Sequence, residues 1–269
     1  MKSNISKKDI ASGKEIIKKL SELNPKLLPH LLKKTIPDYQ KFLPHPHKYG
    51  LWSSNKTKHS RFNQKYDKIM LLISGVTAGG KDAIHQEMEK LAPNLFSKSV
   101  TATSRPPREG EVHGQDYYFF ESHETFRKSI KNSEFIEYYK RGETYYGLPK
   151  KSLENSINHP SPVIYSQLEM SGWSKAEKHI SKINQNIFIL KIFIIPEMNF
   201  SKYQNWLVEK RSDNDLESRL NKTGWELKKA PKKADFIITN RIEKSTDSLT
   251  KTAQTIINQI TDLLKDSVK

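Results

Sequence analysis

The chain of 269 residues contains no cysteine, which excludes disulfides and thiolate-bound metal sites. It has no apolar run near the roughly 20 residues that a membrane helix needs, since even its longest run, 187–195, is interrupted by Lys191. The N-terminus also lacks the apolar stretch of a secretory signal peptide. From these absences we expect a soluble, cytoplasmic protein with no membrane partner.

Positive charge is unevenly distributed along the chain, whose formal net charge is +16. Residues 1–68 contain 16 Lys and Arg against 5 Asp and Glu, whereas the remainder contains 30 against 25. We therefore predict that residues 1–67 form a basic, mainly helical or irregular N-terminal extension. Such a segment can bind nucleic acid or an acidic partner, but the interpretation that we favour is an extension packed against the main domain.

From Lys68 onward, short apolar runs alternate with helical patterns. The unbroken run 69–73 predicts a central parallel strand, buried on both faces. Further strands are expected at 99–103, 163–167, 187–195 and 236–239, with helices over 82–91 and 249–264. Strands separated by helices predict an α/β fold with a mostly parallel central sheet flanked by helices. The aromatic-rich and turn-rich residues 104–160 break this rhythm and predict an inserted α+β subdomain.

A glycine-rich segment at 75–82, Gly-Val-Thr-Ala-Gly-Gly-Lys-Asp, follows the first strand and opens a helix. It satisfies the phosphate-loop pattern G-x-x-x-x-G-K, in which backbone N–H groups and a helix N-terminus surround phosphate oxygens and the lysine neutralises them. The residues expected to contact the nucleotide phosphates are Gly75, Thr77, Ala78, Gly79, Gly80, Lys81, Asp82 and Ala83.

Asp82 stands where this pattern usually has the Ser or Thr hydroxyl that binds Mg²⁺. A carboxylate is also a good Mg²⁺ ligand, so Asp82 is a candidate metal-binding residue. A simple glycine turn with an aspartate helix cap is the alternative interpretation.

Residues 101–120, TATSRPPREGEVHGQDYYFF, closely resemble the signature T-[TS]-R-x-P-R-x-G-E-x-x-G-x-D-Y-x-F of the guanylate kinase family and match its fixed positions. A second block, from 135–137 to 145–147, resembles the family's F-[IL]-E…Y-Y-G. The resemblance extends over 68–265. It implies a P-loop kinase that uses ATP and Mg²⁺ to phosphorylate GMP or dGMP, with a GMP-binding subdomain at 104–160 and a helical lid at 197–228.

The chemistry of these blocks agrees with an acceptor nucleotide. Arg105 and Arg108 lie three apart in a proline-stiffened stretch and can grip a phosphate, and Tyr117 and Tyr146 offer hydroxyl groups to it. Glu137 can accept hydrogen bonds from guanine N1–H and the N2 amine, groups that adenine lacks. The resemblance adds Thr101 and Glu169 as further contacts to the base.

The resemblance also implies roles outside the acceptor site. With Lys81, Arg211 and Arg219 of the lid would stabilise the transferring phosphoryl group, and Asn240 would lie beside the ATP adenine. Besides Asp82, and Glu169 in place of an aspartate, two positions lack a group that the family has. Gln167 replaces an acidic residue, and Leu148 stands where the family usually has Ser or Thr, so a metal-organising charge and one hydrogen bond to the base are missing.

Two other functions fit the sequence. The first is a catalytically silent guanylate kinase-like module that binds proteins, although such domains usually lose the phosphate-loop lysine, which is Lys81 here. The second is a kinase of the same fold for another phosphorylated acceptor, such as a ribose bisphosphate. The intact acceptor block at 103–119 disfavours that function.

Overall fold

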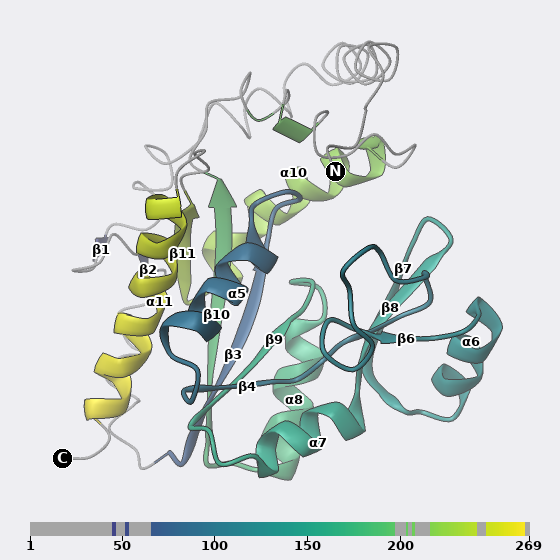
Figure 1. Ribbon diagram of the computed structural model, residues 1–269, viewed down its shortest axis with the longest axis horizontal. Coiled ribbons are helices and arrows are strands. Elements are labelled where there is room, and N and C mark those ends of the chain that lie inside the picture. Colours follow the sequence, from purple (N-terminus) through teal and green to yellow (C-terminus); the bar gives the residue numbers. More distant parts are fainter. Residues whose placement is uncertain are drawn as a thin grey trace. The chain divides into compact units, whose positions relative to one another are not determined.

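The computed structural model describes residues 45–46, 52–53, 66–196, 203, 206–207, 216–240 and 246–266 (Figure 1). Most of the predicted N-terminal extension and much of the predicted lid lie outside these residues. No helix in this part of the chain combines the length and apolar character needed to cross a membrane.

Seven strands form the larger of two sheets, in the order β1-β2-β11-β10-β3-β9-β4. Their bounds are β1 His45–Pro46, β2 Trp52–Ser53, β3 Lys68–Gly75, β4 Phe96–Lys98, β9 Val163–Gln167, β10 Ile187–Pro196 and β11 Phe236–Asn240. β9 pairs in parallel with both β3 and β4, whereas β2 runs antiparallel to β11 at the edge. The predicted α/β class with a mostly parallel central sheet is confirmed.

The central strand β3 shows why its sequence is an unbroken apolar run. Residues 69–73 are all at most 1% exposed. A parallel strand covered on both faces has no side that can carry polar residues. Because β3 leads directly into the glycine-rich segment, burial of this strand holds the start of the phosphate loop in place.

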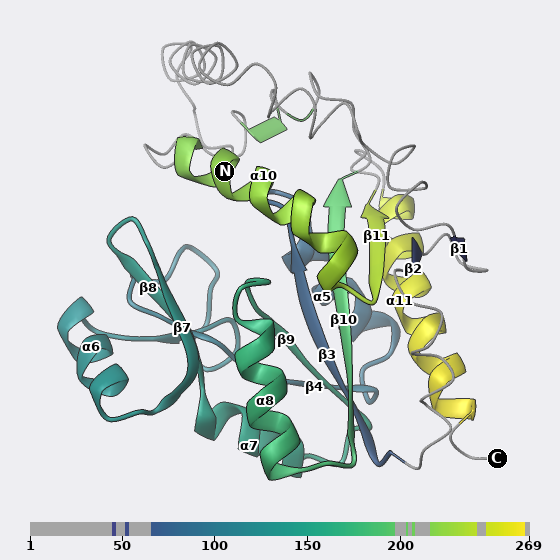
Figure 2. The same ribbon diagram turned by 180° about the vertical axis from the view of Figure 1, so that it is seen from behind.

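The helices that accompany this sheet are α5 (Lys81–Leu91), α7 (Lys150–Asn158), α8 (Trp173–Ile183), α10 (Leu216–Lys233) and α11 (Thr246–Asp266). The two helices expected over 82–91 and 249–264 correspond to α5 and α11. On α11 the buried residues Ala253, Ile256, Ile257 and Ile260 recur at helical spacing. This apolar face explains why α11 runs along β11 (Figure 2).

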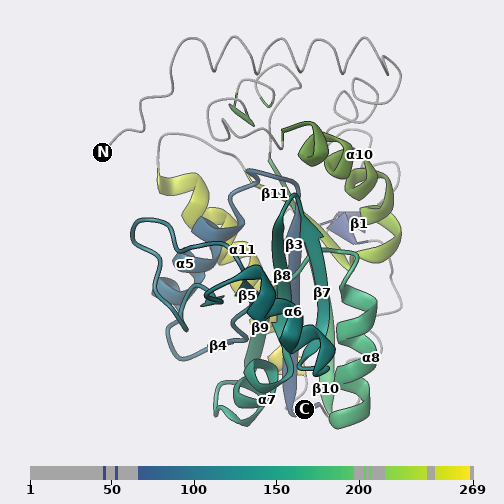
Figure 3. The ribbon, with the colours of Figure 1, turned by 90° about the vertical axis from the view of Figure 1, so that its right-hand side faces the viewer.

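A second sheet of four strands has the order β6-β5-β8-β7. Its strands are β5 Ala102–Thr103, β6 Tyr118–Phe119, β7 Phe135–Arg141 and β8 Thr144–Pro149. β7 and β8 form an antiparallel hairpin (Figure 3), β8 pairs antiparallel with β5, and β5 pairs in parallel with β6. A short helix, α6 (His123–Lys131), begins at a capping box between Ser122 and Thr125.

The single strand expected at 99–103 is wrong. The chain forms β4 in the larger sheet, leaves it, and forms β5 in the smaller sheet. Ser99 is still attached to β9, because its N–H donates to Tyr165 O at 2.8 Å and its carbonyl accepts from Ser166 Oγ at 3.0 Å. Residues 99–101 therefore connect β4 of the larger sheet to β5 of the smaller sheet.

The described chain forms two compact units, whose boundaries fall within β3, α5, β10 and α11. One unit contains Gly75–Met88 together with the described residues from Phe193 to Ile260. The other contains Glu89–Ile192, and with it the four-stranded sheet. The predicted phosphate loop belongs to the first unit, and the predicted acceptor residues belong to the second.

Candidate functional site

The phosphate loop depends on glycine at two positions. A Cβ atom on Gly75 would lie 2.3 Å from the carbonyl oxygen of Ile194, so only glycine allows β3 and β10 to approach this closely. Gly80 has a φ of +82°, a left-handed conformation that other residues rarely adopt. The residue types of the motif are therefore needed for the shape of the loop.

Lys81 folds back over the loop that precedes it. Its Nζ donates to the carbonyl oxygens of Gly75 and Val76, both at 2.9 Å. The ammonium group thus lies at the mouth of the loop, where phosphate oxygens can replace these carbonyls as its partners. Asp82 and Ala83 directly follow Lys81 in the sequence and are exposed in the first turn of α5.

Three side chains hold three successive carbonyl groups of the loop. Tyr203 OH donates to Thr77 O, Trp206 Nε1 to Ala78 O and Asn240 Nδ2 to Gly79 O, each at 3.0 Å. The C=O and the N–H of a planar peptide unit point in opposite directions. Anchoring these carbonyls to surrounding elements therefore turns the N–H groups of Ala78 and Gly80 toward the side where an anion can bind, whereas the N–H of Gly79 donates to Val76 O at 3.1 Å.

Asn240 is buried beside the phosphate loop. Its side chain is 3% exposed, and its two polar atoms contact Gly79 and Thr252, since Oδ1 accepts from Thr252 Oγ1 at 3.2 Å. The amide is thus engaged in holding the phosphate loop. Whether Asn240 also contacts the adenine, as the resemblance implies, stays a prediction.

Replacing Asn240 by Ala removes a buried donor and leaves the Gly79 carbonyl without it. We expect the free energy of unfolding to fall by about 2 kcal/mol, the range of a buried hydrogen-bonding group left unsatisfied. Urea unfolding measures this change. Asn258→Ala on α11, where the amide accepts from Gln254 at the surface, is the control and should change stability by less than about 0.5 kcal/mol. Equal effects of the two substitutions would contradict the anchoring role.

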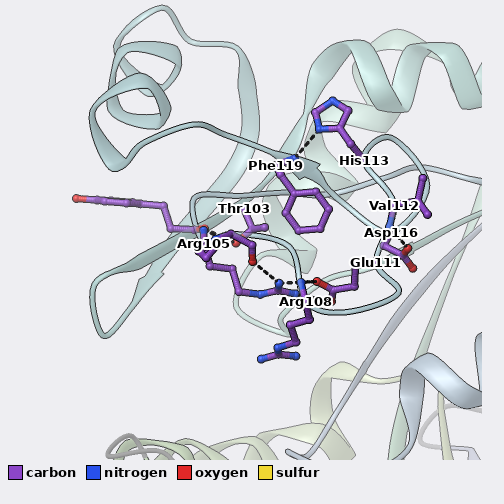
Figure 4. Close-up of polar contacts among 10 residues, drawn as sticks. Thr103, Arg105, Arg108, Glu111, Val112, His113, Asp116 and Phe119 are labelled. Atoms are coloured by element: carbon purple, nitrogen blue, oxygen red, sulfur yellow. Dashed lines mark hydrogen bonds and ion pairs between the residues drawn. The ribbon is translucent and has the colours of Figure 1, made fainter. Parts of the chain in front are cut away.

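In the other unit, Arg105 is held by a two-pronged ion pair (Figure 4). Its Nη1 and Nη2 donate to the two carboxylate oxygens of Glu111 at 2.6 and 2.7 Å. Glu111 also accepts from the backbone N–H of Arg108 at 2.7 Å. The hydrogen bond from Arg105 holds the pKa of the Glu111 carboxyl below its ordinary value of 4.5. The side chain of Arg108 is exposed and extends away from this pair (Figure 4).

A row of aromatic rings continues from Arg105. Its guanidinium lies over the rings of Tyr117 and Phe119, 5.2 and 5.6 Å from their centroids. The Tyr117 ring meets that of Tyr146 edge-on at 6.3 Å, and Tyr146 stacks on Tyr139 at 5.2 Å. The structure therefore brings the predicted residues Arg105, Tyr117 and Tyr146 together on one surface.

The far end of this row carries Arg141 and two carboxylates. Arg141 forms an ion pair with Glu169 and lies over the rings of Tyr139 and Tyr146, 5.6 Å from each centroid. Burial acts to lower the pKa of Arg141, but the neighbouring Tyr139 and Glu169 outweigh it and hold that pKa above its usual range. Glu137, 3% exposed, packs against Gly172, where an added Cβ would lie 2.6 Å from Glu137 Oε2.

The remaining predicted residues are placed as follows. Thr101 is half-buried, and its carbonyl accepts from the N–H of Tyr118 at 2.9 Å. Gln167 ends β9, and Leu148 is fully buried opposite Glu137 in the β7–β8 register. Arg211 lies outside the described residues, and Arg219 lies on α10, where only its backbone is described.

Several residues of these sites were not predicted from sequence. Tyr203 and Trp206 contact loop residues 126 and 128 positions away, and no local pattern reveals such pairs. Tyr139 and Arg141 become recognisable only once β7 is known, because they alternate with its exposed residues after Glu137. Within the described ranges, no group of three or more His, Asp or Glu side chains is arranged to hold a metal ion.

A mostly parallel α/β sheet whose strand leads through a glycine-rich loop into a helix defines the P-loop class of nucleotide-binding proteins. Within that class, the chain belongs to the guanylate kinase family, because the sequence model described as "Guanylate kinase" matches residues 67–258.

Individual relatives agree with this assignment. Guanylate kinases of Ehrlichia canis (strain Jake) and Wolbachia pipientis wMel are each 29% identical to the chain, over 184 and 187 residues. These alignments cover 68% and 69% of this chain and 84% and 89% of the relatives. The crystal structure of guanylate kinase from Anaplasma phagocytophilum is similar in fold, with a TM-score of 0.51 and 24% identity over 76% of this chain and 89% of that one.

Proposed function

We propose that the chain transfers the γ-phosphoryl group of ATP to GMP or dGMP, giving ADP and GDP or dGDP. The observation that carries this proposal is the row from Arg105 through Tyr117 and Tyr146 to Glu137 and Glu169. It offers donors to a phosphate at one end and carboxylate acceptors to a base at the other. Family membership supports the same reaction.

The phosphate loop would bind the donor nucleotide. Its N–H groups and the N-terminus of α5 would surround the β- and γ-phosphates, and Lys81 would exchange the carbonyls of Gly75 and Val76 for phosphate oxygens. Phosphoryl transfer needs in-line positioning and neutralisation of charge more than covalent help from the protein. We therefore propose that Arg211 and Arg219 join Lys81 around the transferring group when the lid closes and water is excluded.

The acceptor would lie along the row in the other unit. Its phosphate would compete with Glu111 for the guanidinium of Arg105, and the exposed side chain of Arg108 is available to the same phosphate. Tyr117 and Tyr146 would donate their hydroxyl groups. Glu137 would accept from guanine N1–H and the N2 amine, with Thr101 and Glu169 as the further base contacts that the family implies.

Mg²⁺ fits the residues at the phosphate loop. This ion keeps much of its water shell and usually takes only one or two protein carboxylates beside the nucleotide phosphates. Asp82, exposed in the first turn of α5, would hold it and replace the charge that the family has at Gln167. The bound ion would neutralise charge on the β- and γ-phosphate oxygens.

Asp82→Ala tests this ligand. We expect the Mg²⁺ concentration for half-maximal rate at fixed ATP to rise about tenfold, since a tenfold change corresponds to about 1.4 kcal/mol of lost binding. A Mg²⁺ titration of initial rates gives the value. Asp262→Ala, on α11 and remote in sequence from the loop, is the control. Titration curves of Asp82→Ala and of the unsubstituted protein that superimpose would remove Asp82 from the metal site.

The reaction itself is tested by a steady-state assay of ATP with GMP, dGMP, AMP and UMP. We expect ADP formation with GMP and dGMP and much slower rates with the other two. No ADP formation with any of them would point to a silent protein-binding module, and turnover only with another phosphorylated acceptor would point to a different kinase of this fold. Because both substrates are metabolites of the cytoplasm, we propose that the enzyme acts there.

A further inference from the structure

Arg141 lies on the acceptor face, although no motif of the family points to it. Side chains alternate along β7, so Glu137, Tyr139 and Arg141 share one face of the strand. Exposure agrees with this alternation, because Glu137 is 3% exposed and Tyr138 is 45% exposed. Arg141 is therefore on the same face as the carboxylate proposed to accept from guanine.

The guanidinium of Arg141 is held in one orientation. Glu169 accepts a hydrogen bond from its Nη2, and the rings of Tyr139 and Tyr146 lie 5.6 Å from its central carbon. An arginine carries five N–H donors in a rigid plane, so a guanidinium fixed by one carboxylate and two rings has further donors to offer a ligand.

Arg141 and Glu137 converge on one short turn. The N–H of Gly172 donates to Glu169 O at 2.8 Å, which closes the turn 169–172. Glu137 packs against Gly172 at one end of this turn, and Arg141 is paired with Glu169 at the other. A cation and a carboxylate that are four residues apart on β7 thus meet the same turn.

A hydrogen-bond donor, Arg141, beside a hydrogen-bond acceptor, Glu137, matches the O6, N1 and N2 edge of guanine. Guanine presents an acceptor, O6, beside two donors, N1–H and the N2 amine, whereas adenine presents a donor at N6 and an acceptor at N1. Leu148, directly opposite Glu137 and fully buried, carries no polar group for O6. Resting on the proposed function, we propose that Arg141 is a specificity-determining residue that donates to O6 of the acceptor base while Glu137 accepts from its donor groups.

Three nucleotides, GMP, IMP and AMP, distinguish an O6 contact of Arg141 from a merely structural role. IMP has the O6 and N1–H of guanine but no N2 amine, and AMP has a donor in place of O6. Loss of an O6 contact should therefore weaken GMP and IMP by similar factors and leave AMP unaffected or better bound. Loss of the fold of the site would weaken all three.

The experiment measures kcat and KM for GMP, IMP and AMP at saturating ATP in the wild type and in Arg141→Met. We expect KM for GMP and IMP to rise about tenfold to a hundredfold, the discrimination that a good arginine contact to guanine supplies, while kcat changes less than about threefold. Arg141→Lys, which keeps the charge but not the fork, should give intermediate values. Lys140→Met, the next and exposed residue of β7, is the control and should leave all constants unchanged.

An unchanged KM for GMP and IMP in Arg141→Met, or a rise that is equal for AMP, would overturn the proposal. If circular dichroism shows that this variant does not fold, Arg141→Lys and Arg141→Gln are judged by the same criteria. A wild type that turns over no GMP would defeat the proposed function alone. Equilibrium titration of GMP and AMP onto wild type and variant then decides, since selective loss of GMP binding supports the role of Arg141 and equal affinities overturn it.

Discussion

Replacing Lys81 by Met should lower kcat/KM for phosphoryl transfer by about a thousandfold, the upper range for loss of one preorganised group that stabilises transition-state charge. The ammonium group lies at the mouth of the phosphate loop, bonded to the carbonyls of Gly75 and Val76. Those bonds are replaceable, whereas no neutral side chain can offset the charge that spreads over the transferring oxygens. Initial rates with ATP and GMP measure the effect.

The fold and the acceptor site should survive this change. Lys81 is half-buried, and the substitution removes its hydrogen bonds to the carbonyls of Gly75 and Val76, so we expect a loss of about 1 kcal/mol in stability. The affinity for GMP at equilibrium should change less than twofold, because the proposed GMP-binding residues Arg105, Tyr117 and Tyr146 lie on other elements than Lys81. Lys90→Met, in the last turn of the same helix, is the matched control and should retain the wild-type rate. Lys81→Met with more than a tenth of wild-type activity would exclude Lys81 from catalysis.

The larger sheet was predictable where burial imposes a pattern. The runs at 69–73, 163–167 and 236–239 are mostly apolar because most of their residues are buried in the sheet, and each became a strand. The stretch 99–103 misled because its Ser and Thr residues suit a strand, while hydrogen bonds to β9 and β8 divide it between two sheets. The two-residue strands β1 and β2 fell in the extension predicted to be mainly helical or irregular, since periodicity cannot reveal elements of that length.

The candidate sites were predictable where residues follow a motif. Arg105, Tyr117, Glu137 and Tyr146 stand at the spacings of two sequence blocks, and the structure places Arg105, Tyr117 and Tyr146 side by side. The supporting residues were not predictable in the same way. Tyr203 and Trp206 donate hydrogen bonds to backbone carbonyl groups of the loop. Every residue has such a carbonyl group, so the sequence of the loop does not reveal these partners. Arg141 is recognisable only once β7 and its faces are known.

Glu137→Gln should be the most damaging single change to acceptor recognition. A carboxylate accepts from both N1–H and the N2 amine of guanine, whereas a glutamine amide presents one acceptor and one donor. The misdirected donor would oppose a guanine donor inside a site where Glu137 is only 3% exposed, so water cannot repair the mismatch. Sites built around hydrogen bonds discriminate strongly for this reason, and we expect kcat/KM for GMP to fall about a thousandfold.

The same substitution should favour adenine, and this makes the prediction specific. Adenine offers a donor at N6 and an acceptor at N1, and a glutamine amide can pair with both. We therefore expect kcat/KM for AMP to rise while kcat/KM for GMP falls, so that the ratio of the two changes by more than the roughly thousandfold loss for GMP. Glu143→Gln, the same change at the exposed turn of the β7–β8 hairpin, should have no effect. If Glu137→Gln kept kcat/KM for GMP within threefold of wild type, other groups would have to recognise the base, and Glu137 would be excluded from the GMP-binding site.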